Sequence, residues 1–584
     1  MNPDIPAKSA ETRMSWGSDA AAEMLRQLGI DYVCVNPGSS FRGLHDSLVN
    51  YLGNENPQML LALHEGSVVS IAHGYAKASG RAMAVVLHSN VGLMNGMMGI
   101  FNAWCDRVPI LMLGATGAVD THVRRNWIDW MHTARDQGGM VRHFVKWDDQ
   151  PHSPAATIEA IGRAYMMART APCGPSYVIL DRRLQEDALT APVVLPPATL
   201  FEPPARIVPD RGTVAGAAKL LGEAKAPVIL MGRVSRSQAD WDNRVKLAEL
   251  LGARVITDLR TGASFPTEHP LHGAPPDLFL TGVNRKLLAD ADVVLSLDWT
   301  DVADVMRVGA EEAGPRRLIH VSVDHYVHNG WSGDHQRYSG ADIHLAVEPD
   351  AVLEPLVAAL EERGALKPAL PAAPKPAAGP VAKGLPTLAD IGAALCAVKG
   401  KRELCLARVP LNWPAGAYPF RDPLDYLGYD GGGGVGSGPG MAVGAALALK
   451  GSGRLTIGMM GDGEFLGAPS ALWTAAHYQI PVLLVIANNR SYYTDEIQQE
   501  AVAQHRSRPP ENKWIGQRID DPAIDIPGLA RDFGVESEPQ VTDPALIAAA
   551  LERGLAAVEA GRPYLIDIRI DSTRGSSLDW LNHH

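Results

Sequence analysis

The sequence has few cysteines and no long apolar run. Its 584 residues include five cysteines, which lie far apart and form no CxxC pair: Cys34, Cys105, Cys173, Cys396 and Cys405. This spacing argues against a disulfide framework and a zinc site, and favours reduced thiols. The longest apolar run, 480–487, has the length of a strand, whereas a membrane-spanning helix needs about 20 apolar residues. We therefore expect no membrane partner.

An excess of positive charge is also missing. Lys and Arg number 53 against 65 Asp and Glu, which gives a formal net charge of −12. A nucleic-acid partner is therefore not favoured. Residues 1–16 lack the basic and then apolar pattern of a secretory signal. Together with the reduced cysteines and a composition of 46% hydrophobic and 20% charged residues, this predicts a soluble, cytoplasmic globular protein.

Two proline-rich segments divide the chain into three blocks. At roughly 150 residues per domain, the length predicts three or four domains. We expect domains at 1–190, 210–366 and 387–584, joined by linkers at 191–209 and 367–386. Within each block, helical patterns alternate with short apolar runs that show no polar alternation, which is typical of strands buried on both faces. The predicted fold is α/β, with three doubly wound parallel-sheet domains.

Polar side chains follow two apolar runs of the third block. Gly461-Asp462-Gly463 ends one predicted strand, and Asn488-Asn489 ends the next, with a helical segment between them. The carboxyl ends of neighbouring parallel strands are where open α/β sheets bind ligands. A carboxylate, a side-chain amide and a further oxygen near Ser491 suit Mg²⁺ with phosphate oxygens. Either turn alone would more often be structural, but the two together favour a ligand site.

The same stretch resembles a known fingerprint. GDG, 24 residues and then NN is similar to the thiamine diphosphate (ThDP) motif of the decarboxylase/acetolactate synthase superfamily. The resemblance implies ThDP and Mg²⁺ as cofactors, with Mg²⁺ held by Asp462, Asn489 and Ser491. It implies the following cofactor-binding residues: Pro37, Gly38, Glu65, Val435, Gly461, Asp462, Gly463, Glu464, Asn489, Ser491 and Tyr492. It also implies that the three domains are pyrimidine-binding, middle and diphosphate-binding domains.

Glu65 has two interpretations. It follows an apolar run at the predicted start of a helix, where a carboxylate is stabilised by the helix dipole and often has no other role. The family's pyrimidine-binding domain, however, has a Glu at this point, which shifts the aminopyrimidine to its imino form. The imino nitrogen then generates the ThDP ylide, and the ring stabilises the enamine that follows C–C cleavage. In the family this Glu and the diphosphate site come from different subunits, which implies a homodimer, further paired into a homotetramer.

Within the superfamily, the sequence is most similar to the benzoylformate decarboxylases. The segments VNPGSS and LHSNVG carry this likeness and place Ser39 and His88 in the substrate pocket as catalytic residues with Glu65. A neutral imidazole near pH 7 can move the protons of the reaction. The simpler interpretation of His88 is a strand-end histidine bonded to backbone. The second pocket histidine of these relatives is missing from the matching stretch 297–309, and His73 stands where they have Ala or Asp.

Two further regions depart from, or lack, a family motif. Residues 490–522 do not resemble benzoylformate decarboxylases, and they carry a basic cluster at 505–510 with Lys513 and Arg518. Such a cluster could meet a carboxylate or an acyl-CoA phosphate, although a solvated loop is the commoner explanation. The segment 231–241 follows a buried strand without a GxGxxG turn, so FAD is not indicated.

Three functions fit these observations. The first is a Mg²⁺/ThDP-dependent lyase that decarboxylates a benzoylformate-like 2-oxo acid with an aromatic or bulky side chain. The second keeps ThDP but performs carboligation or another C–C cleavage on an acyl substrate, as acetolactate synthases and 2-hydroxyacyl-CoA lyases do. The third is a catalytically silent ThDP-binding scaffold, against which the retention of Glu65 argues.

Overall fold

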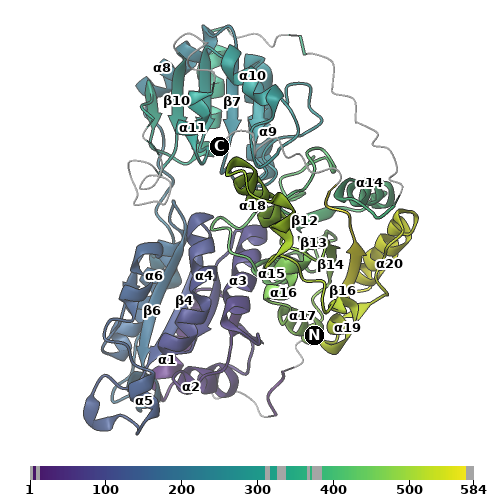
Figure 1. The fold of residues 1–584 in the computed structure, drawn as a ribbon. Coiled ribbons are helices and arrows are strands. Elements are labelled where there is room, and N and C mark those ends of the chain that lie inside the picture. Colours follow the sequence, from purple (N-terminus) through teal and green to yellow (C-terminus); the bar gives the residue numbers. More distant parts are fainter. Residues whose placement is uncertain are drawn as a thin grey trace.

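The computed structural model describes residues 4–7, 13–308, 316–324, 337, 339–364, 369–370 and 384–573. This part of the chain forms three α/β units, each around its own parallel sheet (Figure 1). The fold class predicted from the sequence is therefore confirmed. The predicted linker 367–386 lies mostly outside the described residues. No helix in the described ranges is both long and apolar enough to cross a membrane.

The first unit contains a six-stranded sheet in the order β2-β1-β3-β4-β6-β5. Its strands are β1 (Tyr32–Val35), β2 (Gln58–Leu61), β3 (Met83–Leu87), β4 (Ile110–Thr116), β5 (Asp148–Asp149) and β6 (Pro175–Asp181). Its helices are α1 (Gly17–Gln27), α2 (Arg42–Asp46), α3 (Glu65–Ser79), α4 (Ser89–Cys105), α5 (Ile128–Met131), α6 (Pro154–Arg169) and α7 (Arg182–Glu186). Strands β3, β4 and β6 are buried throughout, as is typical of parallel strands that are covered on both faces.

The second unit contains a five-stranded sheet in the order β11-β10-β9-β7-β8. Its strands are β7 (Pro227–Met231), β8 (Arg254–Thr257), β9 (Val293–Leu297), β10 (Arg317–Val321) and β11 (Ile343–Leu345). Its helices are α8 (Arg211–Gly222), α9 (Gln238–Leu251), α10 (Gly282–Asp290), α11 (Val302–Arg307) and α13 (Leu353–Glu362). A buried ion pair ties this unit to the first, because Arg107, just after α4, contacts Asp298 at 2.5 Å.

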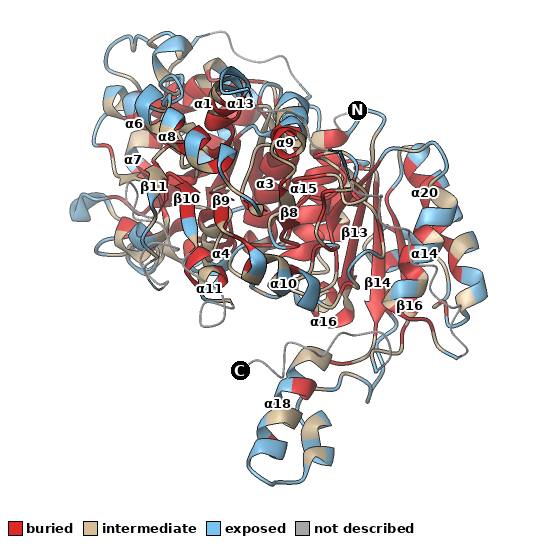
Figure 2. Cartoon of the chain, turned by 90° about the horizontal axis from the view of Figure 1, so that it is seen from above, coloured by how far each residue is buried: buried red, intermediate tan, exposed pale blue. Residues whose placement is uncertain are grey.

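The third unit contains a five-stranded sheet in the order β12-β13-β14-β16-β15. Its strands are β12 (Leu404–Arg408), β13 (Leu455–Gly461), β14 (Val482–Asn488), β15 (Glu536–Ser537) and β16 (Tyr564–Arg569). Its helices are α14 (Leu388–Lys399), α15 (Gly438–Leu449), α16 (Asp462–Gly467), α17 (Ala471–His477), α18 (Tyr493–His505), α19 (Ile526–Asp532) and α20 (Ile547–Glu559). Figure 2 shows buried β13 and β14 at the centre of this unit and α18 projecting from its body.

Helices α3 and α15 join the first and third units through direct backbone contact. A Cβ atom on Gly444 would lie 1.9 Å from the carbonyl oxygen of Ile71, and one on Gly74 would lie 2.0 Å from that of Met441. Real Cβ atoms do not approach other atoms this closely, so both positions require glycine. The apolar residues around the crossing belong to one hydrophobic core that extends across both units.

We expect Gly444→Ala to destabilise the protein, because the added methyl group would force the two helices apart. Overpacking of this kind costs about 1–3 kcal/mol of unfolding free energy. Urea denaturation followed by circular dichroism measures the change. Gly282→Ala is the matched control, since a Cβ there meets nothing within 4 Å. Equal unfolding midpoints for the two variants would contradict the close contact.

Candidate active site

The two polar turns of the third unit lie side by side at the carboxyl edge of its sheet. Strands β13 and β14 are hydrogen-bonded parallel neighbours, and Gly461 is in register with Ala487. Asp462 begins α16 directly after β13, and Asn489 follows β14. The arrangement predicted from the sequence is therefore present, and it brings both side chains to one pocket.

Asp462 is a buried carboxylate with one unpartnered oxygen. Asp462 is 3% exposed, and its Oδ1 accepts no hydrogen bond from the described residues. Burial, with a smaller contribution from the nearby carboxylate of Asp567, raises the pKa of Asp462 to about 6. A divalent cation at Oδ1 would offset both effects, so this carboxylate fits the expected Mg²⁺.

Asn489 and Ser491 complete the same wall of the pocket. The Asn489 amide donates to Ser572 Oγ at 2.9 Å, and its Oδ1 accepts from the backbone N–H of Ser491 at 2.9 Å. The Ser491 hydroxyl donates to Glu496. The amide oxygen keeps a second lone pair. Among the described residues, no three His, Cys, Asp or Glu side chains form a metal cluster. The assignment of these three residues to Mg²⁺ stays a prediction.

The pocket itself has a volume of about 950 Å³, counted to its open mouth. Gly461, Gly463, Glu464 and Tyr492, all predicted from the sequence to bind the cofactor, line it together with Val435. Val435 is 61% exposed, so its side chain is available to a ligand.

A buried arginine in this pocket was missed by the sequence analysis. Arg408 ends β12 and lines the pocket, where its guanidinium lies 2.5 Å from Asp430, 3.3 Å from Glu464 and 3.9 Å from the ring centroid of Tyr429. Glu464 also accepts a hydrogen bond from the first N–H of α15, at Gly438. Arg408 therefore connects the glycine-rich turn to α16. The sequence signal that could have identified Arg408 is its position inside an apolar run.

Glu65 lies at the carboxyl edge of the first sheet. It begins α3, as predicted, and is 6% exposed. Asn95 of α4 donates to its Oε2 at 3.1 Å. The cap of α3 is the preceding residue, His64, whose side chain accepts from the N–H of Gly66. Because His64 fills the capping role, Glu65 is left available for another partner.

His88 lies beside Glu65 at the same edge, between β3 and α4. Its Nδ1 lies 2.8 Å from the hydroxyl of Ser40, so the contacting serine is the residue after the predicted Ser39. Ser39 is half-buried and Pro37 is exposed in the same turn. Gly38 is pressed against the imidazole, since a Cβ on it would lie 2.2 Å from the ring.

Burial, together with the charges of His132 and Arg125, lowers the pKa of His88 to about 4, whereas Glu65 opposes this shift. The imidazole is therefore neutral at physiological pH. His132 reaches His88 from the segment after β4, with ring centroids 4.4 Å apart. No local pattern in the sequence points to His132, because its role depends on a contact between distant segments.

Within one chain, the polar residues of the first unit and the pocket of the third unit do not form a single site. The residues that line the pocket of the third unit do not include Glu65, His88 or Ser39. The described chain therefore carries two half-sites, one with the carboxylate and imidazole and one with the candidate metal ligands.

Lys513, Arg518 and His73, which the sequence analysis singled out, each lie next to a carboxylate. In the basic cluster, Lys513 pairs with Glu500 at 2.5 Å, and Arg518 lies 3.4 Å from Glu496. Both acids belong to α18, which supports the solvated-loop interpretation for these two cations. His73 is fully buried, with its Nε2 2.9 Å from Asp106.

These observations define a three-domain α/β enzyme scaffold with a ligand pocket at strand ends. The chain belongs to the thiamine pyrophosphate enzymes: the N-terminal TPP binding domain matches residues 15–140, the central domain 214–332 and the C-terminal TPP binding domain 411–568. The buried Asp462 and the glycine-lined pocket fit the thiamine diphosphate of this family.

Individual relatives have different reactions. Benzoylformate decarboxylase of Pseudomonas aeruginosa is 28% identical, covering 94% of this chain and 98% of that protein. A probable acetolactate synthase large subunit of Methanocaldococcus jannaschii is 26% identical, with 95% and 92% covered. The structure of a thiamine diphosphate-dependent 4-hydroxybenzoylformate decarboxylase from Rhodococcus jostii has the same fold, with a TM-score of 0.77, 24% identity, and 95% and 99% covered. The family of the chain is therefore common to enzymes with different reactions.

We expect Mg²⁺ binding to weaken below pH 6. The raised pKa of Asp462, about 6, means that its carboxylate is protonated as the pH falls through this value, and Mg²⁺ binds only the ionised form. The dissociation constant for Mg²⁺ in the presence of ThDP should rise about fivefold from pH 6 to pH 5 and stay nearly level from pH 7 to pH 8. Isothermal titration calorimetry measures it. Asp462→Asn should abolish this pH dependence together with tight binding, and a wild-type affinity that does not change with pH would contradict the assignment.

Proposed function

We propose that this chain is a Mg²⁺- and ThDP-dependent lyase that decarboxylates a benzoylformate-like 2-oxo acid with an aromatic or bulky side chain. Glu65 carries the proposal. It is a buried carboxylate whose helix is already capped by His64, and it lies beside the neutral imidazole of His88. A silent scaffold would have no use for this arrangement.

Each half-site has a defined task in this proposal. ThDP, when bound, supplies a nucleophilic carbon and an electron sink for C–C cleavage. Asp462, Asn489 and Ser491 would hold its diphosphate through Mg²⁺, and Val435 would contact the cofactor from the glycine-rich turn. Glu65 would bind the pyrimidine ring and hold a proton there.

His88 would exchange a proton with the substrate. Because Ser40 engages Nδ1 at 2.8 Å, Nε2 is the ring nitrogen that remains for exchange. The low pKa keeps the imidazole able to accept a proton at neutral pH. Phe41 packs edge-on against His88, with centroids 6.3 Å apart, and supports the imidazole from the core, since Phe41 itself is 1% exposed.

A second function, carboligation or another C–C cleavage, is favoured by one specific feature. The α18 arm departs from the benzoylformate decarboxylase sequence and projects from the body. Tyr492 and Tyr493, where this arm begins, line the pocket. An acyl substrate or acceptor could therefore meet surfaces that a simple decarboxylase does not have.

The two half-sites lead us to propose a homodimer in which each active site combines residues of both subunits. Helix α4 presents an apolar stripe next to Glu65, since Val91, Met94 and Met98 are 38%, 53% and 41% exposed. Burying such a stripe favours association. We further propose that two dimers form a homotetramer and that the enzyme is cytoplasmic.

We expect aldehyde and CO₂ to be released from aromatic 2-oxo acids only with ThDP and Mg²⁺. A panel of benzoylformate, phenylpyruvate, 2-oxobutyrate and pyruvate, assayed with and without an added aldehyde acceptor, separates decarboxylation from formation of a 2-hydroxy ketone. Glu65→Gln should reduce turnover roughly 10²–10⁴-fold while ThDP still binds. If no acid reacts although ThDP binds, the proposed decarboxylase function is wrong. Acyl-CoA and diketone substrates would then be assayed. Unchanged turnover in Glu65→Gln would overturn the assignment of this residue.

The shared site predicts complementation between two inactive variants. When Glu65→Gln and Asp462→Asn chains are coexpressed at equal levels, random pairing should restore about a quarter of the wild-type activity, because half of the dimers then carry one intact site of two. Each variant alone should be inactive, and mixing without subunit exchange should restore nothing. Absence of recovery in purified heterodimers, separated by two affinity tags, would show that the half-sites do not combine across subunits.

A further inference from the structure

A second histidine lies against His88 in the first half-site. The ring of His132 meets that of His88 edge to face, with centroids 4.4 Å apart and planes at 81°. The Nδ1 atom of His132 is buried and has no hydrogen-bond partner among the described residues. Buried polar nitrogens without partners are uncommon and call for a functional or structural explanation.

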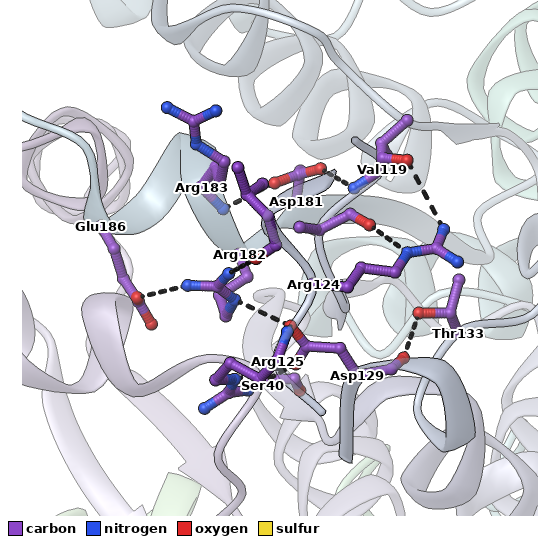
Figure 3. Close-up of polar contacts among 12 residues, drawn as sticks. Ser40, Val119, Arg124, Arg125, Asp129, Thr133, Asp181, Arg182, Arg183 and Glu186 are labelled. Atoms are coloured by element: carbon purple, nitrogen blue, oxygen red, sulfur yellow. Dashed lines mark hydrogen bonds and ion pairs between the residues drawn. The ribbon is translucent and has the colours of Figure 1, made fainter. Parts of the chain in front are cut away.

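His132 belongs to the segment 117–133 that follows β4, and this loop is held by charged residues of the loop itself and of α7 (Figure 3). Asp129, which is 1% exposed, accepts from the N–H and from Nε of Arg125, at 2.8 and 2.9 Å. Arg182 of α7 contacts Asp129 at 3.3 Å and donates to the carbonyl of Val123 at 2.9 Å. The hydroxyl of Thr133, the residue after His132, donates to the Asp129 carbonyl at 2.5 Å.

The backbone of His132 is also fixed. Its carbonyl accepts from the N–H of Gly117 at 3.2 Å, which closes the loop at its base, and its own N–H donates to Ile128 at 3.0 Å. The loop therefore has little freedom to move His132 away from His88. Such local bonds are needed because the loop has no sheet of its own to support it.

The groups that face His88 come from three elements. Ser40 and Phe41 follow β1, Glu65 begins α3, and Arg125 and His132 belong to the loop. Three of these groups carry or can carry charge. The charges of His132 and Arg125 oppose a proton on His88, and the charge of Glu65 favours one.

We propose that His132 is a positioning residue for proton transfer by His88, whose imidazole it holds in an edge-to-face contact. The inference rests on the proposed function for its catalytic meaning, because a neutral His88 is the form that accepts a proton from the reaction. His132 acts through His88 and is assigned no contact with substrate.

The test follows the titration of His88 directly and does not depend on activity. With ¹³C-labelled histidine, the His88 resonance is assigned by its loss in His88→Gln, and its pH midpoint is compared in the wild type, His132→Phe and His132→Gln. Phenylalanine retains an aromatic edge-to-face contact without charge, and glutamine retains a polar group without charge. His122→Phe is the control, since His122 is exposed on the same loop.

Removing the imidazole at position 132 should raise the His88 midpoint by about 0.5–1 pH unit, because a like charge is removed while burial is retained. In the active enzyme the acid limb of kcat/KM should move to higher pH by the same amount, with kcat at pH 8 changed less than twofold in His132→Phe. His122→Phe should match the wild type.

A His88 midpoint unchanged in both His132 variants would overturn the proposal. A shifted midpoint in a protein that turns over no substrate would retain this coupling and reject the proposed function instead. If His132→Phe fails to fold, His132→Gln alone decides the outcome by the same criterion.

Discussion

The contact between α3 and α15 is the constraint on which the rest of the molecule depends. Gly74 and Gly444 allow the backbones of these two helices to touch, so the first and third units share one core. Glu65 begins α3, and the glycine-rich turn with Val435 leads into α15. The positions of both half-sites are therefore set by one helix crossing, and a side chain at either glycine would disturb both.

Charge is compensated differently at two buried positions of the pocket in the third unit. Arg408 is satisfied by Asp430 and Glu464 within the chain, so this group is complete before any ligand arrives. Asp462 has an oxygen without a partner, and its pKa is raised by burial. The third unit thus combines a neutralised support with an unsatisfied ligand position. A cation that binds Asp462 together with a phosphate would supply the missing partner and thereby stabilise the folded protein.

Much of the fold and part of the site could be predicted from the sequence because they depend on local patterns. Unbroken apolar runs placed the buried strands, and the turns after them placed Asp462 and Asn489; Glu65 begins its helix where the pattern put it. Other features depend on three-dimensional contacts. Ser40 rather than Ser39 meets His88 because of the conformation of one turn, and His132 reaches His88 from 44 positions further along the chain. No spacing rule contains that information.

The loop that carries His132 has a consequence for how such enzymes diversify. Its supports are Asp129, Arg125 and Arg182, and two of these three lie inside the loop itself. An exchange of this segment between related enzymes would carry most of its supports along and leave the helix crossing untouched. Natural variation and laboratory recombination can therefore alter the surroundings of the reacting imidazole while the cofactor scaffold is inherited unchanged.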